Sequence, residues 1–342
     1  MTISSSSLLQ IPASFASVSL GTPSTPLSSK LSAISSSGFT SIELGFPDLL
    51  SFTRTYHNNQ AIPSTDYDSL CIAGIEVHKL CLQHNLGIMM LQPFSNFEGW
   101  PEGSEERKDA FERARGWIRI MGAVGTDMLQ VGSSDSEGIS SDFNVLAKDL
   151  GELADMLAVH GYRLAYENWC WATHAPTWKS VWEIVQLANR PNMGLCLDTF
   201  QTSGSEYADP STPSGLISHL GSQAKLHMNF TQSLQSLTSS IPPEKIYPIT
   251  RSQWSHDYRP YPFNNGYLPV TEVARAVLGT GFRGWFSMEV FDGGADGKWR
   301  DVLREKEELE GFCRGAMEAH MRLLAECAGL GGRGSVGRRV LG

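Results

Sequence analysis

The stretch RLAYENW (residues 163–169) places Glu167 inside a short, mostly uncharged run that is typical of a buried strand. Two later stretches repeat this arrangement around an acidic residue: GLCLDTF contains Asp198, and WFSMEVF contains Glu289. A carboxylate is costly to bury unless a cation or hydrogen-bond donors compensate its charge. Three such stretches in one chain indicate strand ends that converge on a divalent cation.

Oxygen ligands of this kind suit Mg²⁺ or Mn²⁺, with Co²⁺ and Zn²⁺ as further possibilities. The alternative is that the three acids are buried in structural ion pairs with Arg or Lys side chains. Both interpretations remain open at this point, and the metal site is our main prediction.

Strand-like and helical segments alternate along the chain. We expect strands at residues 16–20, 41–44, 86–91, 128–131, 163–168, 194–198 and 285–291, and helices at residues 27–36, 68–85, 105–121, 142–160 and 178–187. This alternation predicts a parallel sheet with right-handed crossovers, and eight such units form a (β/α)₈ TIM barrel. Function in such a barrel lies at the C-terminal ends of the strands, where all three acids are expected. A doubly wound open sheet is the alternative, but no glycine-rich fingerprint follows the first strand.

Composition restricts the class of protein. The 342 residues carry a formal charge of −9, which argues against nucleic acid as a partner. No apolar run approaches the roughly 20 residues that cross a bilayer. The six cysteines show no CxxC spacing, and we expect free thiols in a cytoplasmic protein. We expect a flexible N-terminus over residues 1–14, a barrel over 15–328 and a disordered Gly/Arg-rich tail over 329–342.

Five stretches together support a family resemblance. The chain resembles the sugar phosphate isomerase/epimerase-like barrels related to xylose isomerase, and within them the fungal 3-dehydroshikimate dehydratases. The stretches are LQPFSNFEGWP (residues 91–101), LAYENWCWATHAPTW (164–178), NMGLCLDTFQTSGSEYADP (192–210), WSHDYRPYPFNNGYLPV (254–270) and GFRGWFSMEVFDG (281–293).

The resemblance implies a xylose isomerase-like barrel that holds a divalent metal, namely Mg, Mn or Co. It implies loss of water from 3-dehydroshikimate to give protocatechuate, in the breakdown of quinate or shikimate. The metal ligands that it implies are Glu167, Asp198 and Glu289. A cation at the substrate's ketone suits this reaction, because removal of the neighbouring proton creates negative charge there.

The fourth metal ligand is where the chain departs from the family. Relatives place a Gln or His on the seventh strand, but the matching segment here is EKIYPIT, which puts Thr250 at that position. Pro248 also removes a backbone N–H from an expected central strand. Water could take the ligand's place, or the chain could be a catalytically impaired relative. His227 is a possible substitute, although its segment reads as an ordinary helix.

Five further residues are candidates for binding and catalysis. His256 could serve as a general acid or base, because histidine titrates near neutrality. Arg259 could hold the substrate carboxylate through its planar guanidinium. Glu43 could orient a base or bind a substrate hydroxyl, and a buried structural role is the alternative. His174 and Gln201 are expected at the same rim as substrate-binding residues. Gln201 stands where bacterial relatives often carry a histidine.

Two other functions remain open. The same barrel could isomerise or epimerise a ketose, with the metal bridging two substrate oxygens. The chain could instead be a non-catalytic relative that lost its fourth ligand. Whether the chain is a dehydratase or an isomerase or epimerase, its partner is a small-molecule substrate, and a homo-oligomer is possible.

Overall fold

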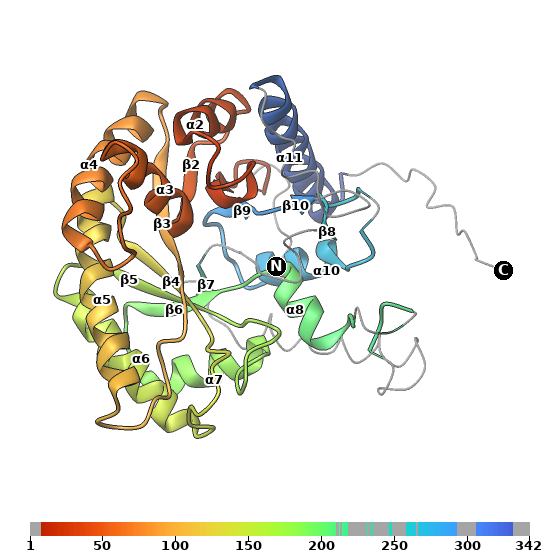
Figure 1. The fold of residues 1–342 in the computed structure, drawn as a ribbon. Helices are drawn as coiled ribbons and strands as arrows, with labels where there is room; N and C mark the ends of the chain where they lie inside the picture. Colours follow the sequence, from red (N-terminus) through yellow and green to blue (C-terminus); the bar gives the residue numbers. More distant parts are fainter. Residues whose placement is uncertain are drawn as a thin grey trace.

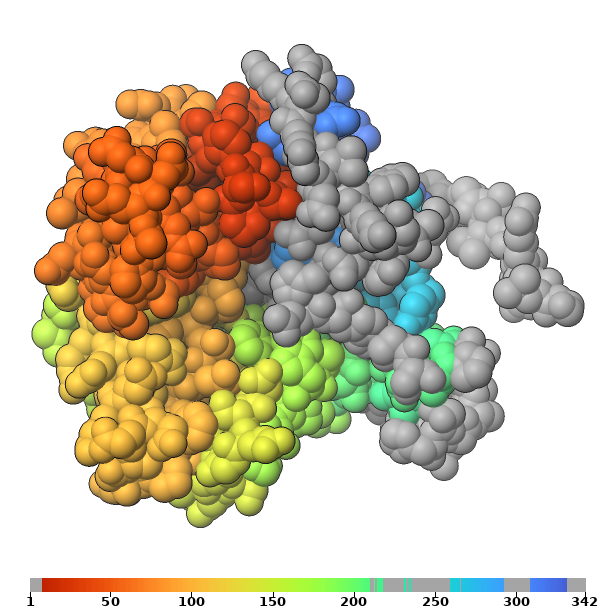
Figure 2. Space-filling view, in the orientation of Figure 1, coloured from red at the N-terminus to blue at the C-terminus, as the bar shows by residue number. Residues whose placement is uncertain are grey.

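The structure is a computed structural model that describes residues 8–209, 212, 214–217, 231, 234, 246–247, 258–264, 266–292 and 306–330. Three residues discussed above, His227, Thr250 and His256, lie outside the described residues, as does the Gly/Arg-rich stretch from residue 331. In the space-filling view the segments from red to yellow pack into one continuous body (Figure 2).

A curved parallel sheet is the centre of the molecule, as predicted. Its eight strands lie in the order β7-β6-β5-β4-β3-β2-β1-β9, and all pair in parallel. The strands are β1 (Ala13–Ala16), β2 (Ser41–Gly45), β3 (Gly87–Phe94), β4 (Met128–Gly132), β5 (Arg163–Glu167), β6 (Met193–Cys196), β7 (Ile246–Tyr247) and β9 (Phe286–Met288). A separate antiparallel ribbon pairs β8 (Tyr258–Arg259) with β10 (Phe291–Asp292).

The helices are α2 (Leu27–Ser36), α3 (Phe46–Tyr56), α4 (Tyr67–Gln83), α5 (Glu105–Val124), α6 (Phe143–Ala158), α7 (Trp178–Ala188), α8 (Thr199–Glu206), α10 (Val270–Gly279) and α11 (Lys306–Cys327). Helices α4, α5, α6 and α7 lie along the outer side of the sheet, and α8 stands away from the strands, next to α10 (Figure 1). The large hydrophobic core lies between the helices and the sheet. No helix in the described part of the chain is long and apolar enough to span a membrane.

The inner face of the sheet is layered. Met90, Met128, Ala165 and Cys196 belong to a small buried apolar cluster. Side chains two residues apart on a strand point to the same face. The residues two positions further along therefore form a second layer nearer the strand ends, and this layer is polar: Gln92, Gln130, Glu167 and Asp198. The polar layer is where the candidate site is found.

Local sequence explains several helix boundaries. The side chains of Asp66, Ser104, Asp142 and Thr177 each accept a hydrogen bond from a backbone N–H in the first turn of the following helix. This satisfies donors that a helix start otherwise leaves free. Helix α5 ends at Gly125, whose φ of +75° suits a residue without Cβ.

The first strand differs from the prediction. β1 spans Ala13–Ala16, and a 3-10 turn, η1 (Ser17–Ser19), occupies most of the segment expected to be a strand. The reason is that two buried serines bind neighbouring strand ends: Gly45 N donates to Ser17 Oγ at 3.0 Å, and Val290 N donates to Ser19 Oγ at 3.1 Å. Leu8 and Ile11, which precede the boundary predicted at residue 15, are buried in the core.

Helix α3 (Phe46–Tyr56) was not predicted. It starts directly after β2 with Pro47 in its first turn, where a proline is favourable because that N–H has no helical partner. Pro47 therefore favours a helix start in a segment for which the sequence analysis assigned no element.

Candidate active site

The three predicted acids all lie at the C-terminal edge of the sheet, as expected. Glu167 is the last residue of β5, Asp198 follows β6, and Glu289 follows β9. Their exposed fractions are 1%, 0% and 4%. Asp198 also accepts a hydrogen bond from Phe200 N at 2.7 Å, so it caps α8. Burial of three carboxylates on one side of a sheet creates a strong demand for positive charge.

Arg259 on β8 supplies part of that charge. Its Nη2 lies 2.6 Å from Asp198 Oδ1, and its Nη1 lies 3.3 Å from Glu289 Oε2. The guanidinium also lies over the ring of Phe200, with 5.2 Å between Cζ and the ring centroid. Only 12% of the arginine side chain is exposed. The structure therefore brings together two predicted metal ligands and the residue expected to bind substrate.

Two buried glutamines contact the acids from neighbouring strands. Gln130 on β4 donates a hydrogen bond from Nε2 to Glu167 Oε2. Gln92 on β3 lies with its Nε2 3.5 Å from Glu43 Oε2, and Glu43 is fully buried on β2. The sequence reasoning missed both glutamines. Each glutamine stands two positions after a methionine in an apolar strand. A polar residue at that position in the sequence could have identified both.

Gln201 and His174, predicted to bind substrate, have different surroundings. Gln201 is fully buried in α8, and its Oε1 accepts a hydrogen bond from Cys170 N at 2.9 Å, which ties the loop after β5 to this helix. Its Nε2 forms no hydrogen bond among the described residues. His174 is half-buried in the loop after β5.

Cys170 is the thiol beside these carboxylates. Burial, and then the negative charge of Asp198, raise the pKa of the Cys170 thiol to about 12. The thiol form therefore dominates near neutral pH, and Cys170 is not suited to act as a nucleophile.

A cavity of about 750 Å³ is lined by Glu289, the one member of the three acids among its lining residues. Arg259 and Glu272 also line it, and Tyr261 and Tyr267 are among its aromatic residues. Aromatic side chains beside an arginine suit a small ring-shaped molecule that carries a carboxylate.

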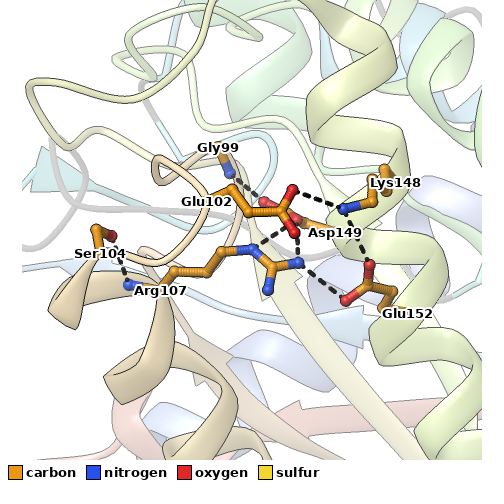
Figure 3. A network of polar contacts seen from close by, with 7 residues as sticks. All are labelled: Gly99, Glu102, Ser104, Arg107, Lys148, Asp149 and Glu152. Carbon is orange, nitrogen blue, oxygen red and sulfur yellow. Dashed lines mark hydrogen bonds and ion pairs between the residues drawn. The ribbon is translucent and has the colours of Figure 1, made fainter.

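A network of charged side chains from α5 and α6 holds the loop after β3 in place (Figure 3). Asp149 of α6 is buried and accepts hydrogen bonds from Gly99 N at 2.9 Å and from Arg107 Nη2 at 2.8 Å. Arg107 also reaches Glu152, and Lys148 extends the network to the exposed Glu102. Gly99 has a φ of +91°, and a Cβ there would lie 2.7 Å from Leu146 Cδ2, so both its conformation and the close packing favour glycine.

The same loop carries Glu98, whose buried carboxylate the sequence analysis did not identify. Glu98 Oε1 accepts hydrogen bonds from Ser134 N at 2.8 Å and from Tyr166 Oη at 2.7 Å. Burial raises the pKa of Glu98, and it also raises the pKa of Tyr166 well above its ordinary value. Glu98 therefore links the loops after β3 and β4 to the residue that precedes Glu167.

Replacing Asp149 by Ala is expected to destabilise the chain by about 3 kcal/mol, because it leaves Gly99 N–H and the guanidinium of Arg107 without a buried acceptor. Urea unfolding followed by circular dichroism measures the change. Glu102→Gln is the matched control from the same network, since Glu102 is 82% exposed and should change stability by less than about 1 kcal/mol. Equal effects of the two substitutions would show that Asp149 does not anchor the loop.

The residue types at the strand ends fit a divalent cation. All three acids offer hard oxygen donors, and a guanidinium placed between two of them shows that the position requires a cation. Among the described residues, however, no group of three or more His, Cys, Asp and Glu side chains is arranged to hold a metal ion. Arg259 contacts one carboxylate oxygen of Asp198 and one of Glu289.

Comparison with known proteins gives consistent results. The sequence profile of the xylose isomerase-like TIM barrel family matches residues 31–309. The chain is 30% identical over 299 residues to a 3-dehydroshikimate dehydratase of Neurospora crassa. This alignment covers 78% of this chain and 81% of the relative. It is 29% identical over 291 residues to a 3-dehydroshikimate dehydratase of Pseudomonas aeruginosa. That alignment covers 82% of this chain but 38% of the bacterial protein.

Solved structures share the fold. The structure of the IOLI protein with a binding zinc atom superposes with a TM-score of 0.66 at 17% identity, and the match covers 92% of this chain and 98% of that chain. This likeness and the family profile together confirm the predicted barrel.

Proposed function

Because this chain belongs to the xylose isomerase-like TIM barrel family and is related to 3-dehydroshikimate dehydratases, we propose that it is a divalent-metal-dependent hydro-lyase that converts 3-dehydroshikimate into protocatechuate and water. The observation that carries the proposal is the group of buried acids at the strand ends with Arg259 beside them. In this proposal Glu167, Asp198 and Glu289 hold Mg²⁺, Mn²⁺ or Co²⁺. When bound, the cation supplies Lewis-acid chemistry at the substrate's ketone.

The substrate's carboxylate needs a cationic partner, and Arg259 is the best placed of the described residues. Its guanidinium lines the cavity beside Glu289 and can offer two parallel N–H donors to a carboxylate. The buried Nε2 of Gln201 is a further donor for a substrate oxygen. His174 is assigned the outer rim of the same site.

The reaction requires removal of the proton next to the ketone and departure of the neighbouring hydroxyl as water. Glu43 is the acid–base candidate within the described residues, because its carboxylate is fully buried on β2 and lies 3.5 Å from Gln92 Nε2. His256 is assigned the second acid–base position. The product ring is aromatic, which makes the overall step favourable.

The setting of the reaction is part of the proposal. We propose quinate or shikimate breakdown as the setting, because its reactions supply this substrate. All six cysteines are free thiols, and three of them are buried, which supports a reducing cytoplasmic compartment.

Incubation of purified protein with 3-dehydroshikimate and Mn²⁺ or Mg²⁺ is expected to give protocatechuate, which is followed by its absorbance. An EDTA-treated sample should give none, and readdition of the metal should restore the rate. A folded protein that binds metal but forms no protocatechuate would overturn the dehydratase assignment. Faster turnover of a keto-sugar from a test panel would point to an isomerase or epimerase instead.

A further inference from the structure

The outermost face of α4 carries apolar side chains that the fold leaves exposed. The residues on this face are Asp68, Ile72, Ile75, Lys79 and Leu82, which we call the α4 stripe. Ile72, Ile75 and Leu82 are 51%, 47% and 60% exposed. None of the three belongs to a hydrophobic cluster among the described residues. Single exposed apolar side chains are ordinary on a protein surface, but three along one helix face indicate a contact surface.

The spacing of the α4 stripe suits a second helix. Its members follow one another at intervals of four, three, four and three residues. Alternating intervals of three and four are those of the a and d positions through which two helices pack side by side. The opposite side of α4 is used within the chain, because Leu70 and Val77 are buried in the core and α3 and α5 contact the helix. Helix α4 lies at the edge of the molecule far from α8 and α10 (Figure 1).

We propose that the α4 stripe is the interface of a homodimer in which the α4 helices of two copies pack antiparallel. A two-fold axis makes the contacts reciprocal, so each pair of facing residues occurs twice. In the register centred between residues 73 and 74, Ile72 faces Ile75 of the second copy, and Asp68 faces Lys79 of the second copy. Four isoleucines then form the centre of the interface, and one pair of opposite charges lies on each side of it.

Charge complementarity is the observation that favours a second copy of this chain as the partner. Asp68 and Lys79 are 81% and 59% exposed, so both charges are available at the surface. Their ion pairs within the chain, with Arg119 and Glu76, are also at the surface, where such pairs contribute little to stability and can rearrange. The stripe therefore carries both the acid and the base that an antiparallel copy of itself requires.

A second antiparallel register has the same spacing but poorer contacts. It sets Ile72 opposite Leu82 of the second copy, but it also sets Lys79 opposite Ile75, so a charge would face an apolar side chain. One helix face per copy is small beside the roughly 800 Å² that a stable interface buries on each partner. We therefore expect a weak dimer, with a dissociation constant of about 10 to 100 µM.

Sedimentation velocity of the purified protein, at concentrations from about 1 to 200 µM, tests the dimer. The unchanged protein should shift from monomer toward dimer across this range. Ile75→Glu places a charge at the centre of the interface and should leave the protein monomeric at every concentration. Leu187→Glu is the matched control, because Leu187 is 45% exposed on α7 and should not affect the dimer. A monomer at all concentrations, or a dimer that Ile75→Glu leaves intact, would overturn the proposal.

Charge reversal tests the antiparallel register. Asp68→Lys and Lys79→Asp should each weaken the dimer by about fivefold or more, because two attractive contacts become repulsive. The double variant Asp68→Lys, Lys79→Asp sets opposite charges against each other again and should associate within about twofold of the unchanged protein. A double variant that associates no more tightly than either single variant would overturn the register and the proposed interface with it. These measurements need no substrate, so their outcome is independent of the proposed function.

Discussion

Replacing Asp198 by Asn is expected to lower Mn²⁺ affinity at least 100-fold and to reduce protocatechuate formation on the order of 1000-fold. Loss of residues that merely orient a metal ligand already costs about 10- to 100-fold in affinity or activity, so loss of a ligand's charge should cost more. Asn is chosen because it can still cap α8 by accepting the hydrogen bond from Phe200 N. The measurements are a metal titration and an activity assay on the same preparation.

The control for this substitution is Asp155→Asn. Asp155 is also paired with an arginine, Arg190, but it is 56% exposed and lies on α6. The Asp155→Asn substitution should leave metal affinity and activity unchanged. Activity of Asp198→Asn within a few-fold of the unchanged protein would remove Asp198 from the proposed ligands.

Replacing Lys30 by Met is expected to lower the free energy of unfolding by about 3 to 5 kcal/mol, because it leaves the charge of Asp48 buried without its partner. Lys30 Nζ lies 2.7 Å from Asp48 Oδ1, and the exposed fractions of the two side chains are 0% and 2%. Lys30 Nζ also donates to Ser17 O at 3.2 Å, so the pair joins α2 and α3 to the turn after β1. Urea unfolding measures the loss.

Two further variants make this result specific. The double variant Lys30→Met, Asp48→Leu should recover most of the stability, since a buried pair can be replaced by apolar residues at little cost. Lys79→Met breaks an ion pair whose lysine is 59% exposed and should change stability by less than about 1 kcal/mol. If Lys30→Met were as stable as the unchanged protein, the pair would not matter to the fold.

Much of the fold could be predicted from the sequence, because apolar periodicity and caps mark most elements clearly. The segment predicted as a helix over residues 27–36 is α2, and the strands predicted around Ser41, Met128 and Arg163 are β2, β4 and β5. The errors arise where tertiary contacts decide. Ser17 and Ser19 end β1 early because they bind strands that are distant in sequence, and no local pattern reveals those partners.

The candidate site could be predicted in part. Acids inside apolar runs are conspicuous, so Glu167, Asp198 and Glu289 were identifiable, and the structure places all three at the strand ends. Arg259 was predicted to bind the substrate carboxylate, whereas its pairing with two of these acids depends on a ribbon that forms only in the folded chain. A buried glutamine such as Gln130 carries no charge and differs little from its surroundings in sequence.

Because of the order of the strands, the backbone holds the three acids with unequal rigidity. Glu167 ends β5, which pairs with a neighbour on both sides, and its ladder to β4 joins five residue pairs. Glu289 follows β9, which in the described part of the chain pairs only with β1, through three residue pairs. The neighbours of Glu289 are tied individually, Val290 N to Ser19 Oγ and Phe291 to Arg259, whereas Glu167 ends a continuous ladder. In the proposed metal site we therefore expect Glu167 to fix the position of the centre and the Glu289 side to accommodate ions of different radius.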